Sequence, residues 1–175
     1  MKLVIVDYGA GNLRSVARAV AHAGGEPLIT SAGRDVERAG ALIVPGVCMG
    51  QQALFDVSEE GGEHPCLGVL PGRVVRLPGG LKVPHMGWNQ VRIVRPHPVF
   101  EGIPDESYFY FVHSYYPSPE DPQIVIGETD YGVTFASVVG RDNVVATQFH
   151  PEKSGAMGLR MYENFLRLAA GAAVR

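Results

Sequence analysis

The segment PGVCMGQQALF, residues 45–55, places a cysteine between a strand-like run and helix-forming residues. Cys48 follows the apolar run ALIV, and Gly46 and Gly50 flank it two positions away on each side. The N-terminus of a helix favours a thiolate through its dipole, and its free amides can hold an oxyanion. Small residues are needed around such a nucleophile elbow. The pattern predicts either a nucleophilic cysteine or a small buried hydrophobic residue.

A histidine and a glutamate follow the strand-like run NVVATQF in the segment ATQFHPEKS. Residues two apart on an extended chain point to the same side, so we expect His150 and Glu152 on one face. A cysteine nucleophile needs a base and then an acid, and imidazole serves as both when a carboxylate orients it. A lone histidine at a strand end is usually structural, but its combination with Cys48 favours a catalytic triad.

Three further segments have competing interpretations. YGAGNLRS is a glycine-rich turn typical of dinucleotide binding, but it lacks the third glycine, and Thr30 and Ser31 stand where an acidic residue is needed. The alternative is a tight strand-to-helix turn whose exposed Asn12 and Arg14 face a partner. VPHMGWNQV contains the only tryptophan, Trp88, and its composition predicts a loop that either anchors an interface or closes the core. YFYFVHSYY is aromatic but has no basic residue, which favours a strand entering a pocket over nucleic-acid stacking.

The elements that position these residues begin with a parallel pattern. KLVIVD, residues 2–7, is a nearly continuous apolar run typical of a strand buried on both faces. Apolar residues then recur at helical spacing from Leu13 until Gly24-Gly25 end the helix. The strands EPLIT and ALIV follow, with a short helical turn at 34–38 between them. This order predicts a parallel α/β sheet.

The second half has strand-like runs separated by Pro, Gly and Asp, which predict an antiparallel or mixed extension of the sheet. They are RVVRL, QVRIV, YFYFVHSYY, QIVIGET, VTFASVV and NVVATQF. A closing helix over residues 155–170 has an apolar stripe, and Ser154 is its expected N-cap. With no repeat or linker, residues 1–175 are expected to form a single domain.

The composition argues against several partners. Fifteen Lys and Arg against 18 Asp and Glu give a formal net charge of −3, which favours neither nucleic acid nor an anionic membrane. No apolar run approaches about 18 residues, and the N-terminus turns polar too early for a signal peptide, so we expect a cytoplasmic protein. Two cysteines and scattered histidines predict neither a disulfide framework nor a metal site.

Taken together, these segments resemble the class I, or triad-type, glutamine amidotransferases, and more narrowly the glutaminase subunits of imidazole glycerol phosphate synthase. The resemblance covers nearly the whole chain and rests on VDYGAGNLRSV, VPGV, CMGQQ, PHMGWN, YFVHSYY and QFHPEKS. It implies a three-layer α/β fold with a mixed, mostly parallel central sheet, helices on both faces and an antiparallel extension. It implies no cofactor.

The resemblance also implies residue roles. The catalytic triad is Cys48, His150 and Glu152. Positions that match glutamine-binding residues are Gln52, Glu60, Ser114 and Tyr115. The positions that match the family's oxyanion-binding backbone are Gly46, Val47 and Met49. In the family, the glutaminase subunit docks on a cyclase subunit of (β/α)8-barrel fold and forms a heterodimer with it. The positions that match its docking residues are Asn12, Met86, Trp88 and Asn89. Cys66, His85 and His113 receive no catalytic role.

The implied reaction is hydrolysis of L-glutamine, with ammonia passed to the cyclase. There it serves to make imidazole glycerol phosphate and an aminoimidazole carboxamide ribonucleotide in histidine biosynthesis. The alternatives are another triad glutaminase, such as that of pyridoxal phosphate synthesis, and a non-catalytic flavodoxin-like binding module. The motifs PHMGWN and FVHSYY argue against the first alternative.

One junction departs from the family pattern. In the family, VPG and the cysteine elbow end two neighbouring parallel strands, and a parallel crossover needs a dozen or more residues. Here one residue separates Gly46 from Cys48. A true deletion would remove a central strand, at a cost beyond the usual stability of about 5 to 15 kcal/mol. We therefore expect a segment of about 25 residues to be missing between Val47 and Cys48.

Overall fold

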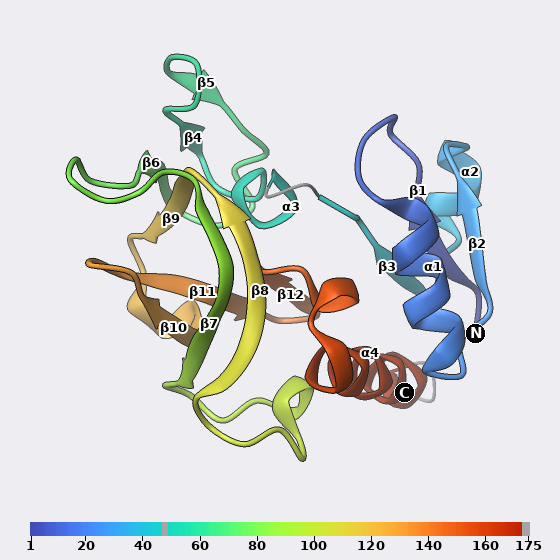
Figure 1. Ribbon diagram of the computed structural model, residues 1–175. Coiled ribbons are helices and arrows are strands. Elements are labelled where there is room, and N and C mark those ends of the chain that lie inside the picture. The colour runs from blue at the N-terminus through green and yellow to red at the C-terminus, as the bar shows by residue number, and fades with distance from the viewer. Residues whose placement is uncertain (47–48, 173–175) are drawn as a thin grey trace. The chain divides into compact units, whose positions relative to one another are not determined.

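A computed structural model describes residues 1–46 and 49–172, apart from the side chains of Met49 and Ala172. The chain divides into two compact units (Figure 1). Unit 1 comprises Met1–Val47, His97–Ile103 and Pro151–Arg175. Unit 2 comprises Cys48–Pro96 and Pro104–His150.

Unit 1 contains the predicted parallel α/β arrangement. Its strands form one parallel sheet in the order β2-β1-β3, with Leu3 opposite both Pro27 and Ala41. The short α2 coincides with the helical turn predicted at 34–38 to within a residue. The elements of unit 1 are β1 (Leu3–Val6), α1 (Leu13–His22), β2 (Pro27–Thr30), α2 (Gly33–Glu37), β3 (Ala41–Ile43), η1 (Pro98–Phe100), η3 (Pro151–Lys153) and α4 (Gly155–Ala172).

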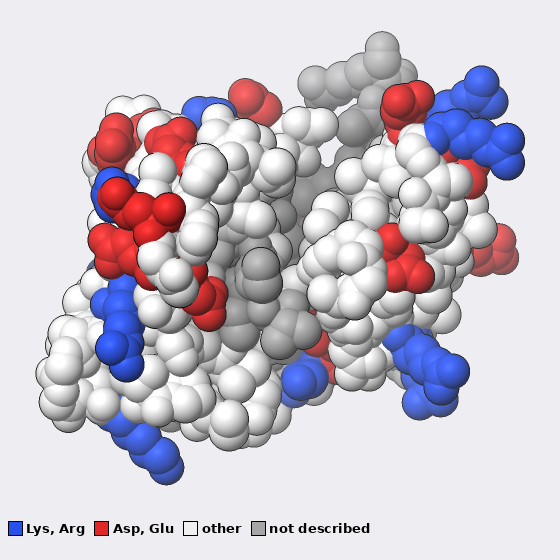
Figure 2. Space-filling view, turned by 90° about the horizontal axis from the view of Figure 1, so that it is seen from above, with Lys and Arg blue, Asp and Glu red and all other residues white. Residues whose placement is uncertain are grey.

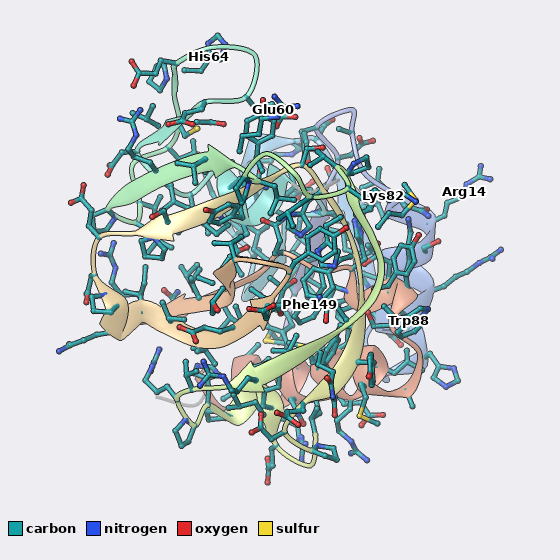
Figure 3. All side chains as sticks on the ribbon, turned by 60° about the vertical axis from the view of Figure 1, so that its left-hand side comes forward. Arg14, Glu60, His64, Lys82, Trp88 and Phe149 are labelled. Atoms are coloured by element: carbon teal, nitrogen blue, oxygen red, sulfur yellow. The ribbon has the colours of Figure 1, made fainter. Side chains whose placement is uncertain are left out.

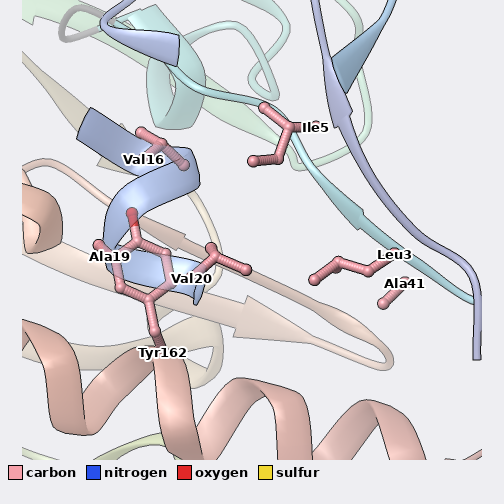
Figure 4. Close-up of a cluster of buried hydrophobic side chains, with 7 residues drawn as sticks. All are labelled: Leu3, Ile5, Val16, Ala19, Val20, Ala41 and Tyr162. Carbon is pink, nitrogen blue, oxygen red and sulfur yellow. The ribbon is translucent and has the colours of Figure 1, made fainter. Parts of the chain in front are cut away.

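The core of unit 1 joins α1 and α4 to this sheet. Val16, Ala19 and Val20 recur at helical spacing on α1, so they lie on one face and are buried together. They pack with Leu3 of β1 and with Tyr162 of α4 (Figure 4). Burial of this apolar stripe, at about 1.5 to 3 kcal/mol for each large side chain, stabilises α1 against the sheet.

Unit 2 consists mostly of antiparallel strands, as predicted for the second half. Five strands pair in the order β12-β11-β10-β7-β8, and four in the order β5-β4-β6-β9. Within the second sheet, β4 and β6 pair in parallel. The elements of unit 2 are α3 (Met49–Gln52), β4 (Val57–Ser58), β5 (His64–Pro65), β6 (Gly72–Arg76), β7 (His85–Ile93), β8 (Ser107–His113), β9 (Tyr115–Pro119), η2 (Pro122–Ile124), β10 (Val125–Asp130), β11 (Thr134–Arg141) and β12 (Val144–Thr147).

The prediction of a loop around Trp88 is wrong. Residues His85–Ile93 form the long strand β7, which pairs with β8 from His85 opposite His113 to Val91 opposite Ser107. The polar and glycine residues that suggested a loop stand on a strand with one exposed face. Pairing with the aromatic strand β8 outweighs their low strand propensity.

Most of the face drawn in Figure 2 is uncharged. Several acidic side chains lie close together at the left of the view, with a few basic side chains beside and below them. In the described part of the chain, no helix combines the length and the apolar character needed to cross a membrane. The described side chains also contain no group of three or more His, Cys, Asp or Glu arranged to hold a metal ion.

Candidate active site

His150 is positioned by the aromatic core of unit 2. The chain leaves β12 through Phe149, whose ring stacks on Phe109 with centroids 4.2 Å apart and meets Phe111 edge-on at 5.5 Å. The backbone N–H of His150 donates to the carbonyl oxygen of Tyr110 at 2.9 Å. His150 is only 5% exposed. Figure 3 labels Phe149, the residue that anchors this segment.

Glu152 lies in unit 1, on the short helix η3. The extended chain predicted for His150 to Glu152 is wrong, because Pro151–Lys153 form a 3-10 turn. This turn packs tightly on α4: a Cβ added at Gly158 would stand 1.9 Å from the carbonyl oxygen of Pro151. Burial raises the pKa of Tyr162 on α4, and the negative charge of Glu152 raises it further. The carboxylate of Glu152 therefore interacts electrostatically with Tyr162 on α4.

The proposed nucleophile lies outside the described residues, as does Val47, and of Met49 only the backbone in α3 is described. Because His150 and Glu152 belong to different units, the triad with Cys48 stays a prediction. Of the predicted oxyanion segment, Gly46 follows β3 and the buried Pro45.

The glycine-rich turn before α1 packs on this VPG segment within unit 1. The hydroxyl of Tyr8 donates to the carbonyl oxygen of Pro45. Gly11 has a φ of +90°, and a Cβ added there would stand 3.0 Å from the same oxygen. Only glycine combines this backbone conformation with so close an approach. Asn12, a predicted docking residue, caps α1 by accepting a hydrogen bond from the Ser15 N–H at 3.2 Å.

The predicted glutamine-binding residues divide into a connected group and a separate one. Gln52, on α3, is 4% exposed, and its Nε2 donates to the carbonyl oxygen of Tyr115 at 2.7 Å and to Oε1 of Gln148 at 3.0 Å. Ser114 precedes Tyr115 at the β8–β9 turn and is half-buried. Three of the four predicted residues are therefore held in one region of unit 2.

Glu60 stands apart on the turn between β4 and β5. It is exposed, and its backbone N–H donates to Oγ of Ser58 at 3.2 Å. Figure 3 labels Glu60 and His64 on this hairpin. The exposed position leaves the Glu60 carboxylate accessible to a ligand.

Two buried histidines that received no role lie next to the Gln52 group. Nδ1 of His85 and Nε2 of His113 are 2.9 Å apart across the β7–β8 pair. Burial lowers the pKa of each ring from 6.5 to about 4. Gln148, likewise unpredicted, is 1% exposed and contacts Gln52 directly. Side chains on a strand alternate between its two faces, so His85 lies on the same face of β7 as the buried Val91. This alternation is the sequence signal that could have identified His85 as an inward-facing residue.

The predicted docking residues of β7 point to both faces of the strand. Met86 and Trp88, two residues apart on the outer face of β7, are 62% and 55% exposed, and Figure 3 labels Trp88. The Nδ2 of Asn89 instead donates to the carbonyl oxygen of Asp130 at 2.8 Å and lies 3.3 Å from Nε2 of His85. Met86 and Trp88 thus form an exposed apolar pair, while Asn89 contacts the interior.

Comparison with known proteins identifies the family. The family model described as glutamine amidotransferase class-I matches residues 38–169. Imidazole glycerol phosphate synthase subunit HisH of Dehalococcoides mccartyi (strain CBDB1) is 46% identical, covering 97% of this chain and 98% of that protein. HisH of Desulfitobacterium hafniense (strain DSM 10664 / DCB-2) is 45% identical, covering 92% of each. The chain belongs to the HisH family of class-I glutamine amidotransferases.

Solved structures show the same fold for this HisH family member at lower identity. A putative GMP synthase protein from Thermoplasma acidophilum aligns with a TM-score of 0.71 at 17% identity, covering 99% of this chain and 96% of that one. PurLQS from Thermotoga maritima aligns with a TM-score of 0.70 at 15% identity, covering 96% and 99%. The predicted α/β class-I glutamine amidotransferase fold is confirmed, and the flavodoxin-like binding module is disfavoured.

Proposed function

We propose that this chain is the glutaminase subunit of an imidazole glycerol phosphate synthase, which hydrolyses L-glutamine and supplies ammonia to a cyclase subunit in histidine biosynthesis. The observation that carries the proposal is the identity of 44 to 46% with HisH subunits over 92 to 97% of this chain. The partner is a cyclase of (β/α)8-barrel fold, in a heterodimer, and the expected location is the cytoplasm.

The chemistry proceeds through a covalent thioester. The Cys48 thiolate attacks the side-chain amide carbon of glutamine, and backbone amides among Gly46, Val47 and Met49 hold the oxyanion. His150 protonates the departing nitrogen, which leaves as ammonia. His150 then takes a proton from water as the water oxygen attacks the thioester, releasing glutamate and the thiolate. Glu152 orients the imidazole and stabilises its protonated form.

Substrate and partner contacts complete the proposal. Gln52 and Glu60 recognise the glutamine substrate, and Ser114 and Tyr115 contact its amino-acid part. The outer face of β7, with Met86 and Trp88 exposed, is the proposed docking surface, since exposed aromatic and methionine side chains anchor protein interfaces. Asn12, in unit 1, and Asn89, on the inner face of β7, are the other two residues that the resemblance matches to docking.

The contacts of Pro45 support coupling between docking and catalysis. Tyr8 and Gly11, from the turn that carries Asn12, both touch Pro45 of the oxyanion segment. A partner that moves this turn therefore biases the segment that must accommodate the oxyanion. Equal glutaminase rates for the isolated chain and for the complex with a liganded cyclase would contradict this coupling.

The experiment that tests the function compares two cysteine variants in complex with the cyclase subunit. Cys48→Ser is expected to reduce ammonia release from glutamine by roughly 1,000-fold or more, because the serine hydroxyl lacks the activation of a thiolate. Cys66→Ser is the matched control: Cys66 is half-buried outside the proposed site, and its Sγ lies 3.9 Å from the carbonyl oxygen of His64. Unchanged activity in Cys48→Ser would overturn the nucleophile assignment.

A further inference from the structure

A continuous hydrogen-bonded series of side chains crosses unit 2 from β7 to α3. It begins at Asn89, passes through the rings of His85 and His113, and reaches the carbonyl oxygen of Tyr115, 2.9 Å from Nδ1 of His113. Gln52 on α3 donates to the same oxygen. All of these residues belong to unit 2.

The chemistry of the end groups determines the direction of the series. The carbonyl oxygen of Tyr115 can only accept, so Nδ1 of His113 must carry a proton. In a neutral ring its Nε2 is then an acceptor, and Nδ1 of His85 must donate to it. That leaves Nε2 of His85 to accept from the amide of Asn89. The hydrogen bonds from Asn89 through the two rings therefore all point toward the Tyr115 oxygen, and Gln52 donates to that oxygen from α3.

The two rings are held in place and kept neutral. His85 stacks on Tyr131 at a centroid distance of 3.9 Å and on Phe111 at 5.0 Å. His113 meets Phe135 edge-on at 5.0 Å. Burial of both rings keeps them unprotonated near neutral pH, since the pKa of each is lowered to about 4. The direction of the hydrogen bonds is thus the same throughout the physiological range.

The far end of the series fixes the orientation of the Gln52 side chain. Its Nε2 donates both to the Tyr115 oxygen and to Oε1 of Gln148. With the amide nitrogen engaged on these two acceptors, Oε1 is the atom of Gln52 that is oriented to accept a hydrogen bond from a ligand. A shift of the Tyr115 carbonyl would move this oxygen.

The other end of the series, Asn89 and His85, lies on β7, the strand that carries the exposed Met86 and Trp88. Alternation on β7 puts His85 and Asn89 on the inner face and Met86 and Trp88 on the outer face. A movement of β7 therefore displaces the two hydrogen-bond donors that this strand carries, Asn89 and His85.

We propose that His85 and His113 are positioning residues for glutamine binding: they transmit the position of strand β7 to the Tyr115 carbonyl and the Gln52 side chain. This inference rests on the proposed function in that Gln52 is taken to bind the substrate. It adds a physical connection between the outer face of β7 and that residue.

The kinetic test uses His113→Phe in complex with the cyclase subunit. Phenylalanine fills the space but removes both ring nitrogens, so the KM for glutamine is expected to rise about tenfold, with a smaller change in kcat. His113→Asn keeps an amide N–H near the position of Nδ1 and is expected to recover part of the loss. A KM in His113→Phe equal to that of the unmodified chain would overturn the proposal.

The matched control is Ile126→Val on β10, which removes one buried methylene group from unit 2 but no member of the series and no ring that holds the two histidines. It is expected to lower the stability while leaving the KM for glutamine unchanged. An equal rise in KM for Ile126→Val and His113→Phe would overturn the proposal, because it would show a general packing effect.

A measurement independent of activity separates this inference from the proposed function. In ¹⁵N NMR spectra of the labelled chain, both rings are expected as neutral tautomers protonated at Nδ1, and His113→Phe is expected to speed hydrogen exchange at the Gln52 side-chain amide. Absence of glutaminase activity in the unmodified complex would contradict the proposed function alone. Unchanged Gln52 exchange in His113→Phe would contradict the positioning role even then.

Discussion

At the scale of single residues, adjacent glutamines on α3 differ sharply in how well their amides are satisfied. Gln52 makes hydrogen bonds of 2.7 and 3.0 Å. Gln51 is 2% exposed, but its Nε2 lies 3.4 and 3.5 Å from the carbonyl oxygens of Ala136 and Ala146. Among the described residues its Oε1 has no partner. A buried amide that is poorly paired lowers the stability of the folded state.

We therefore expect Gln51→Met to raise the free energy of unfolding by about 1 kcal/mol. Methionine has a similar volume and needs no hydrogen bond. Urea denaturation of the two proteins measures the change.

The matched control is Gln52→Met, which removes two good hydrogen bonds from the neighbouring residue of α3. It is expected to lower both the stability and the affinity for glutamine. A Gln51→Met protein less stable than the parent would show that Gln51 contributes more than its distances indicate.

At the scale of elements, the β7–β8 pair makes the stability of the protein depend on pH. Its two cross-strand histidines have pKa values lowered from 6.5 to about 4 by burial, so at pH 5 the unfolded chain binds more protons than the folded chain. Stability is therefore present in full above about pH 6.5 and is lost as the pH falls toward 4. We expect a loss of roughly a few kcal/mol over this range, measured by urea denaturation at a series of pH values.

The control for this prediction is His113→Phe, which removes one of the two titrating rings and is expected to reduce the pH dependence by about half. Hydrogen bonds from Lys2 and Arg73 lower the pKa values of Asp35 and Glu63 from 3.8 and 4.5, so any stability these carboxylates contribute is lost only at the acid end of this range and below it. Constant stability between pH 6.5 and 4.5 would contradict the burial of the histidine pair.

At the scale of the whole molecule, the junction between Val47 and Cys48 decides the organisation of the chain. This junction is one of the places where the chain passes from one unit to the other. The alignment with the Dehalococcoides protein extends over 201 residues, whereas this chain has 175, so that relative has residues without a counterpart here. Both observations support our proposal that a segment of about 25 residues belongs between Val47 and Cys48 in a single glutamine amidotransferase domain.

Intact mass spectrometry of the protein expressed from its natural gene tests this proposal. We expect a mass about 3 kDa above the 18.8 kDa of the present sequence, which corresponds to the crossover helix and strand. A mass near 18.8 kDa would establish a true deletion and contradict the proposal.

The sequence by itself determined the family, the parallel start of the chain and most strand positions, because these follow from local patterns: the apolar run at β1, the helical spacing of α1 and the motifs CMGQQ and QFHPEKS. It misjudged the segment around Trp88, where pairing with β8 outweighs composition. Only the tertiary structure decided which side chains meet across strands. The His85–His113 contact and its connection to Gln52 depend on strand register and on residues far apart in the chain, which no local pattern specifies.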